Sequence, residues 1–436
     1  MKYIQNILIV LGLLCIATRS QSQSKNTSMV DAAAQKVEAQ VIKYRHHFHQ
    51  YPELSNREFK TSDKIVEYLS AMGYKPEQGM AHTGVVAVLD SGKPGPTIGL
   101  RADIDGLPVT ERNNLSYKSN ETSTYQGNEV GVMHACGHDT HVSMLLGVAQ
   151  SLMDMKRDLK GKVVFVFQPA EEGAPPGEEG GAKLMIKEGL IEKYGIDVMF
   201  GQHISSREDI GKITYKFGGL MAAADRFEIT VKGVQAHGSR PWSGVDPIVT
   251  SAQIIMGLQT IISRQTNLTK EAAVITVGMI QGGVRNNIIP EECKMVGTIR
   301  TLDVEMQDII HEKIKKTATA IAESQGATAE VVIDKYCPVT FNNLELTRQM
   351  LPSLFEAAGE SNVQVIPAIT GAEDFSFYAK EVPALFYFVG GRTPGDTTPH
   401  PHHSPDFVVD DKGMITGVKA LLQLTLDYMD ASDKGE

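Results

Sequence analysis

The chain has 436 residues, of which 42% are hydrophobic and 22% are charged. This composition excludes a disordered or collagen-like chain, and the length favours two domains. The 42 Lys and Arg residues stand against 52 Asp and Glu residues, which gives a net charge of −10, and no basic run indicates nucleic-acid binding. Cysteines occur only at Cys15, Cys136, Cys293 and Cys337, too few and too scattered for a disulfide framework.

The N-terminus has the pattern of a secretory signal peptide. Lys2 precedes an apolar stretch at 7–17, and a polar run begins at Thr18. We place the signal at 1–23 and expect an exported protein, periplasmic or secreted. The apolar stretch is too short for a stable membrane span. Two alternatives stay open, namely lipid attachment at Cys15 and a retained N-terminal anchor.

Beyond the signal, short apolar runs alternate with helical patterns. Residues 29–72 predict helices with a break near His49, and 142–155 predicts another helix. Buried strands are predicted at 85–89, 97–102, 163–167, 198–201 and 384–389. Strands that alternate with helices indicate an α/β domain whose mostly parallel sheet is covered by helices.

The middle of the chain has a different pattern of predicted strands and helices. Strands are predicted at 225–232, 273–279, 293–300 and 329–334, and helices at 247–263 and 304–325. The order β-α-β-β-α-β is that of a ferredoxin-like α+β domain. We therefore expect a catalytic domain in two parts, 29–218 and 336–436, with an inserted lid or dimerisation domain at 219–335.

Most potential metal ligands follow strands of the larger domain. They gather in four segments, 133–141, 167–173, 200–204 and 399–405. In open α/β sheets, ligands collect outside the carboxyl ends of the strands, so these segments are expected to converge. A set of thiolate, imidazole and carboxylate donors suits Zn or Mn rather than Mg or Ca alone.

Two of these segments carry informative spacings. Cys136 and His138 are two residues apart, which indicates a turn at a helix start from which both can reach neighbouring metal ions. Glu171 and Glu172 are adjacent, so their side chains point to opposite sides of the chain. One of them can bind metal while the other transfers a proton.

Together with further motifs, these segments resemble a known family. The motifs lie at 49–55, 100–108, 136–139, 169–173, 234–241, 287–290 and 371–375. They are similar to the aminoacylase/carboxypeptidase family of dinuclear metallohydrolases. The similarity is greatest to its amidohydrolase branch, which contains N-acyl-amino-acid amidohydrolases, hippurate hydrolases and plant auxin-conjugate hydrolases.

The resemblance implies a site with two divalent metal ions per chain, Mn or Zn. The ligands it implies are Cys136, His138, Glu172, His203 and His403. His403 is favoured over His402 because it directly precedes Ser404 and Pro405. The resemblance makes Glu171 the general acid/base. It also places Asp103 near the site and gives Asp105 an orienting role. The resemblance leaves His134, His141 and His400 unassigned, and we expect them at supporting positions around the ligands or at the rim of the site.

Residues of the inserted domain complete the implied site. His237 resembles a lid histidine that reaches the active site of the partner subunit in a homodimer, with a buried strand-end histidine as the alternative. Asn287 and Arg300 resemble residues that approach the substrate, with a surface ion pair as the alternative for Arg300. The loop after Glu172 carries extra residues at 174–179 compared with the common pattern.

The resemblance implies an enzyme that hydrolyses the amide bond of small N-acyl amino acids and releases a carboxylic acid and a free amino acid. A carboxypeptidase or dipeptidase that acts on short peptides is the alternative. A non-catalytic binding protein of the same fold would have lost Glu171 or a metal ligand, and all of these residues are present.

Overall fold

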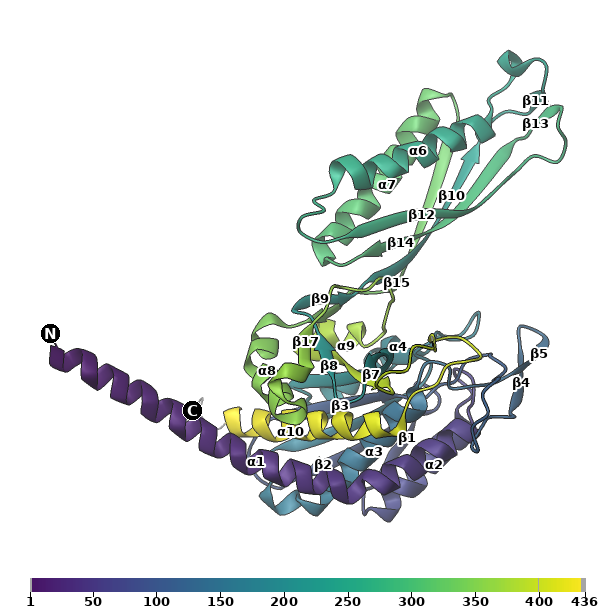
Figure 1. Cartoon of the computed structure of the whole chain (residues 1–436). Helices are drawn as coiled ribbons and strands as arrows, with labels where there is room; N and C mark the ends of the chain where they lie inside the picture. Colours follow the sequence, from purple (N-terminus) through teal and green to yellow (C-terminus); the bar gives the residue numbers. More distant parts are fainter. Residues whose placement is uncertain (1, 399, 433–436) are drawn as a thin grey trace. The chain divides into compact units, whose positions relative to one another are not determined.

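The computed structural model describes residues 2–398 and 400–432, and it describes side chains from Asn26 onward. The predicted signal peptide therefore lies outside the residues whose side chains are described. The chain forms two compact units (Figure 1). The first comprises Met1–Phe217, Asn342–Ile366 and Tyr378–Glu436, and the second comprises Gly218–Phe341 and Pro367–Phe377. Within the described part, no helix combines the length and the apolarity that crossing a membrane requires.

The first unit is built on an eight-stranded sheet in the order β1-β2-β6-β3-β7-β18-β8-β17. Its strands are β1 (Glu77–Met80), β2 (Gly84–Asp90), β3 (Thr97–Asp103), β6 (Lys162–Gln168), β7 (Val198–Asp209), β8 (Ile213–Tyr215), β17 (Val363–Val365) and β18 (Ala384–Arg392). The four central strands, β6, β3, β7 and β18, run parallel to one another. Strands β1 and β2 pair antiparallel at one edge, and β8 pairs antiparallel with β18. The predicted mostly parallel sheet is confirmed.

Helices cover this sheet because its central strands are apolar on both faces. The helices of the first unit are α1 (Lys2–Gln50), α2 (Phe59–Ala71), α3 (His138–Asp154), α4 (Gly181–Lys187), α5 (Leu190–Tyr194), α8 (Leu344–Ala358) and α10 (Met414–Ser432), and α9 (Ser376–Glu381) crosses the boundary between the units. Helices α1, α3 and α10 pack against one another, and α1 and α10 lie side by side in Figure 1. Helix α3 is buried almost all round, which fixes the position of its first turn.

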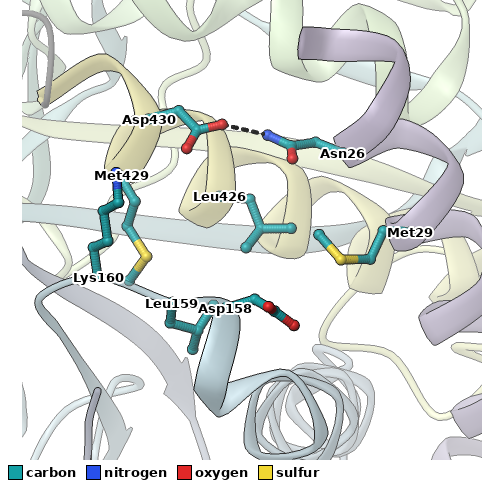
Figure 2. A pocket seen from close by; sticks show the side chains of 8 residues that line it. All are labelled: Asn26, Met29, Asp158, Leu159, Lys160, Leu426, Met429 and Asp430. Carbon is teal, nitrogen blue, oxygen red and sulfur yellow. Dashed lines mark hydrogen bonds between the residues drawn. The ribbon is translucent and has the colours of Figure 1, made fainter. Parts of the chain in front are cut away.

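A pocket of about 300 Å³ lies beside the C-terminal end of α10 (Figure 2). Met29, Leu426 and Met429 line it, and the Asn26 amide closes one side by donating to Asp430 at 2.9 Å. The segment with His402 and His403 precedes the opposite, N-terminal end of α10. This pocket is therefore separate from the cluster of potential metal ligands.

The second unit has a four-stranded antiparallel sheet in the order β12-β14-β10-β15. Its elements are β10 (Ala223–Lys232), α6 (Pro247–Gln265), β12 (Ala273–Gly282), β14 (Glu292–Thr301), α7 (Val304–Ser324) and β15 (Thr328–Cys337). Phe227, Ile254 and Ile310 belong to the core that joins the two helices to the sheet. This chain order and pairing are those of a ferredoxin-like sandwich.

Shorter strands complete the two units. They are the hairpin of β4 (Thr122–Tyr125) and β5 (Asn128–Gly131), the pair of β11 (Ala236–His237) and β13 (Ile288–Ile289), and the pair of β9 (Gly218–Met221) and β16 (Thr340–Asn342).

Candidate metal centre

The first unit brings the five predicted metal ligands together. Together with Glu171, these residues form three overlapping groups, and within each group the potential ligand atoms all lie within 4.8 Å of one another. The groups are Cys136 with His138 and His203, Cys136 with Glu172 and His403, and His138 with Glu171 and Glu172. The shared members join the three groups into one cluster.

A glycine turn places Cys136 and His138 on this cluster. Gly137 has a φ of +97° and is the residue before α3, whose first residue is His138. A Cβ atom at Gly137 would lie 2.3 Å from Cγ2 of Ile204. Only glycine fits this tight, left-handed position, and it turns the flanking thiol and imidazole toward the same space.

The imidazole of His138 is oriented by a buried carboxylate. Its Nδ1–H donates to Oδ1 of Asp105 at 3.2 Å, and Nε2 lies 3.7 Å from Oε2 of Glu171 and 3.8 Å from Oε1 of Glu172. Burial alone would lower the pKa of His138, but the carboxylates of Asp103 and Asp105 outweigh it and raise that pKa to about 10. A cation at Nε2 would take the place of the proton in this acidic surrounding.

The imidazole of His203, on strand β7, is also held through Nδ1, in this case by a backbone carbonyl group. Its Nδ1–H donates to the carbonyl oxygen of Ile204 at 2.6 Å, and its Nε2 lies 3.3 Å from Sγ of Cys136. Burial, with His141 and His402 nearby, lowers the pKa of His203 well below its usual range. The ring is therefore neutral, with the Nε2 lone pair directed at the cluster, which is the form that binds metal ions.

Two adjacent histidines reach Cys136, and their hydrogen bonds distinguish them. Nε2 of His402 accepts the backbone N–H of Ser206 at 3.2 Å, so the proton of the neutral ring is on Nδ1, which lies 3.7 Å from Sγ of Cys136. Nε2 of His403 lies 3.3 Å from the same sulfur and 3.1 Å from Oε1 of Glu172. Both nitrogens of His402 are engaged, and this supports His403 as the candidate ligand.

The donor set fits divalent metal ions. Burial, together with the carboxylates of Glu172 and Glu171, raises the pKa of the Cys136 thiol well above its ordinary value. A cation held by this sulfur, the imidazoles and the carboxylates would reverse that effect and stabilise the thiolate. Mixed sulfur, nitrogen and oxygen donors suit Zn or Mn, so the residues present accommodate the ions that the resemblance implies.

Asp103 and His141 lie at the edge of the cluster and hold each other. Nδ1–H of His141 donates to Asp103 at 2.6 Å, and Nε2 of His141 accepts the backbone N–H of Ile204 at 2.8 Å. Asp103 also accepts a hydrogen bond from Arg101 at 2.8 Å. Both ring nitrogens of His141 are therefore hydrogen-bonded, and the bond to Ile204 holds strand β7 in place beside His203.

The sequence reasoning missed a buried network that anchors the first turn of α3. Asp139 accepts hydrogen bonds from Nε of Arg45 at 3.1 Å and from Nδ1 of His49 at 2.9 Å. Nε2 of His49 lies 3.2 Å from Oε1 of Glu111. Arg45 and His49 come from α1, four residues apart on one helix face, and this spacing was the available signal.

Two further histidines of the ligand-rich segments have distinct surroundings. His134 is 1% exposed, and burial lowers its pKa to about 4. Neither of its ring nitrogens has a hydrogen-bond partner among the described residues. His400 lies 3.1 Å from Asp396 through Nε2 and is half-buried.

The remaining predicted site residues belong to the second unit. His237 is exposed on β11, and its Nδ1 accepts the backbone N–H of Ser239 at 3.1 Å. Because Nδ1 is an acceptor, Nε2 is the ring nitrogen that carries a proton available for donation. Asn287 lies beside it, because the N–H of Gly238 donates to the Asn287 carbonyl oxygen at 2.8 Å.

Arg300 lies on β14 of the same unit. Its Nε donates to the carbonyl oxygen of Thr370 at 3.2 Å, and its Nη1 donates to the carbonyl oxygen of Ile299 at 3.1 Å. Nη1 also contacts the hydroxyl of Thr298. These hydrogen bonds fix the guanidinium group within its own unit.

Comparison with known proteins agrees with this geometry. The family model described as Peptidase family M20/M25/M40 matches residues 99–427. A relative from Saccharolobus solfataricus named thermostable carboxypeptidase 1 is 38% identical over 90% of this chain and 96% of its own length. A Bacillus subtilis protein named N-acetyl-L-cysteine deacetylase is 36% identical over 92% of this chain and 91% of its own length.

A solved structure shows the same fold. It is the Bacillus subtilis YXEP protein, described as a dinuclear metal-binding peptidase of the M20 family. It is 32% identical, has a TM-score of 0.75, and covers 91% of this chain and 99% of its own. The family resemblance predicted from the motifs is confirmed.

Proposed function

Because the chain belongs to Peptidase family M20/M25/M40 it is a metal-dependent hydrolase, and we propose that it splits N-acyl amino acids into a carboxylic acid and a free amino acid. The observation that carries this proposal is the placement of two adjacent carboxylates on one ligand cluster. Glu172 lies 3.1 Å from His403, and Glu171 lies 3.7 Å from Nε2 of His138. One carboxylate is thus available for metal and the other for a proton.

In this proposal, the two ions are held by Cys136, His138, Glu172, His203 and His403. When bound, such ions lower the pKa of a water molecule and polarise the amide carbonyl. Glu171 accepts a proton from the water whose oxygen attacks the carbonyl carbon. As the C–N bond breaks, Glu171 returns that proton to the leaving nitrogen, so that the products are a carboxylic acid and an amine.

The relatives support two neighbouring substrate classes. The name N-acetyl-L-cysteine deacetylase describes removal of an acyl group from an amino acid, which is the reaction proposed here. The name thermostable carboxypeptidase describes hydrolysis of peptides, and it favours short peptides as the second candidate substrate class. Both substrates contain an amide bond next to a free carboxylate, and Arg300 is the residue that the family resemblance suggests for binding that carboxylate.

A substrate panel tests the proposal. Chelated protein is reloaded with Mn or Zn and assayed with N-acetyl, N-benzoyl and indole-acetyl amino acids, with dipeptides, and with N-acyl amino acid amides that lack the free carboxylate. We expect hydrolysis of the N-acyl amino acids by the loaded protein only, and little hydrolysis of the amides. Faster hydrolysis of dipeptides would establish the second candidate, and no hydrolysis of either class would reject both.

We also propose that the protein is exported, on the strength of the N-terminal pattern at 1–23. N-terminal sequencing of the chain recovered from the periplasm or the medium tests this. A mature N-terminus close to residue 24 is expected, whereas an uncleaved chain in the cytoplasm would contradict it.

A further inference from the structure

The turn that carries Glu171 and Glu172 is held through its backbone by two buried carboxyl groups. Asp105 accepts the backbone N–H of Glu171 at 3.1 Å and that of Glu172 at 3.0 Å. Glu58 accepts the N–H of the preceding residue, Ala170, at 2.9 Å. We propose that Glu58 is a positioning residue that aims the Glu171–Glu172 pair at the ligand cluster. The proposal rests on the proposed function for the roles of that pair.

The side chain of Glu58 is buried although it does not serve the helix that follows it. It directly precedes α2, yet its side chain does not cap that helix, and it is 0% exposed. The first turn of α2 is served by Glu53 instead, whose carboxylate accepts the N–H of Thr61 at 2.8 Å. A buried carboxyl group costs stability unless it is hydrogen-bonded. Besides its own backbone N–H, the side-chain partners of Glu58 are the Ala170 amide and the hydroxyl of Thr83, at 2.7 Å, and neither of these belongs to α2.

The residue that Glu58 holds is in an unfavourable backbone conformation. Ala170 has a φ of +52°, in the left-handed region that residues with a Cβ atom avoid, and it is 2% exposed. Such a conformation persists only where the surroundings fix it. The hydrogen bond from the Ala170 amide to Glu58 is one such restraint.

The conformation of Ala170 sets the direction of the two residues that follow it. Oε2 of Glu171 and Oε1 of Glu172 lie 3.7 Å and 3.8 Å from Nε2 of His138. If Ala170 relaxed to an extended conformation, both carboxylates would turn away from this atom. A displacement of a catalytic group by about 1 Å can slow a reaction roughly a hundredfold, because a proton is transferred only between atoms within hydrogen-bonding distance.

Two substitutions at Glu58 separate the hydrogen bond from the charge. Gln has an oxygen that accepts the Ala170 amide and an N–H₂ group that donates to Thr83, whereas Leu fills the space and offers no acceptor. In the metal-loaded protein we expect Glu58→Gln to keep kcat within about threefold of wild type. We expect Glu58→Leu to lower kcat by about tenfold to a hundredfold, with KM nearly unchanged.

A matched control comes from the same segment. Glu53→Leu removes the carboxylate that caps α2 and leaves the turn at Ala170 intact. It should lower the melting temperature and leave kcat unchanged. If Glu58→Leu behaves like Glu53→Leu, or if Glu58→Gln is as slow as Glu58→Leu, the proposal is wrong.

A rescue tests the role of the backbone conformation directly. Glycine adopts positive φ without the Cβ penalty, so Ala170→Gly added to Glu58→Leu should recover several-fold in kcat. If Glu58→Leu does not fold, Thr83→Val provides the milder test, because it frees one oxygen of Glu58. It should lower kcat to a smaller extent, and a Thr83→Val protein that matches wild type in kcat and in the exchange described next would overturn the proposal.

Hydrogen exchange provides a readout that does not depend on catalysis. In a peptide that covers 169–173, the Ala170 amide should exchange faster in Glu58→Leu than in wild type, and Glu58→Gln should restore its protection. This measurement distinguishes a failure of the role of Glu58 from a failure of the proposed substrate. Altered exchange in a protein that hydrolyses no N-acyl amino acid would support the role of Glu58 and reject the proposed substrate, while unchanged exchange would reject the role of Glu58.

Discussion

Oδ1 of Asp105 lies 3.2 Å from Nδ1 of His138, and this contact fixes which ring nitrogen faces the candidate metal centre. Because Nδ1–H donates to the carboxylate, Nε2 is the nitrogen that faces the cluster, where a metal ion would take the place of its proton, and no described residue hydrogen-bonds to it. The same carboxylate accepts the backbone N–H groups of Glu171 and Glu172. One buried side chain thus orients a candidate ligand and the candidate proton carrier together.

Asp105→Asn should weaken metal binding by roughly tenfold to a hundredfold, the usual cost of removing a partner that orients a ligand. Asn offers one acceptor oxygen, so its N–H₂ group would face one of the two backbone N–H groups of the turn. Competition with a chelator of known affinity measures the effect. Ser55→Ala is the control, since it removes only a hydroxyl that donates to Asp105 at 2.8 Å. Equal losses in both variants would contradict the orienting role.

Glu171→Gln and Glu172→Gln should have different phenotypes although they differ by one position. The first should keep the metal content and the fold but nearly abolish turnover, because an amide cannot accept a proton from water. The second should weaken metal binding, since Glu172 lies 3.1 Å from His403 within the cluster. Metal analysis and kcat measured on the same preparations decide this. Exchanged phenotypes would reverse the assignment within the pair.

Cys136→Ser should change which metal the protein prefers. The thiolate is the softest donor in the cluster, and a hydroxyl that replaces it remains protonated and binds Zn less well. The metal content, measured by elemental analysis after gentle purification, should be close to two divalent ions per chain for wild type and lower for the variant. A fully active protein that stays metal-free after chelation would refute the candidate metal centre.

The sequence predicted the fold well where the pattern of apolar residues is local. The apolar run at 163–167 became β6, a strand that is buried along almost its whole length. The strand and helix order in the middle of the chain predicted the four-stranded sheet with α6 and α7. The sequence did not predict that β8 pairs antiparallel with β18, because a three-residue strand has too little periodicity to be read.

The candidate site was less predictable in its supporting contacts. The types and spacings of the ligands identified the segments that converge. Nothing local indicates that Glu58 meets Ala170, because 112 positions separate them and the contact is made by a backbone amide. The two adjacent histidines, His402 and His403, were separable only by analogy. Their difference depends on which ring nitrogen meets the N–H of Ser206, a contact made across the fold.

The stability of the metal-free protein should depend on pH through His49. Burial would lower the pKa of His49, but the Asp139 and Glu111 carboxylates raise it from 6.5 to about 9. The folded state therefore binds this proton more tightly than the unfolded state does. The resulting stabilisation is fully present below about pH 6.5 and is lost as the pH rises to about 9, with a magnitude of roughly 3 kcal/mol.

His49→Gln removes the titrating group and keeps an N–H₂ donor for Asp139, so it isolates this contribution. The difference in free energy of unfolding between wild type and His49→Gln, measured by denaturation of chelated protein, should shrink as the pH rises through this range. A difference that stays constant with pH would show that His49 is not the group responsible.

We propose that the protein acts as a homodimer in which His237 serves the partner subunit. In the second unit, β12 and β15 lie at the edges of the sheet, and their open backbone groups can pair with a second copy. Val249 and Met256 are exposed on α6, and they would add apolar area to such a contact.

A mixing experiment tests the role of His237 across the dimer. Nδ1 of His237 accepts the N–H of Ser239, so the Nε2–H is available to stabilise an oxyanion. The loss of one such donor typically slows a reaction roughly a hundredfold to a thousandfold, so His237→Ala should be slow with unchanged metal content. Mixing His237→Ala chains with Glu171→Gln chains should restore part of the activity, because each mixed dimer then contains one site with both residues intact. Subunit exchange is verified with differently tagged chains. If the subunits exchange and the mixture stays inactive, or if a proven monomer is fully active, His237 does not act on the partner subunit.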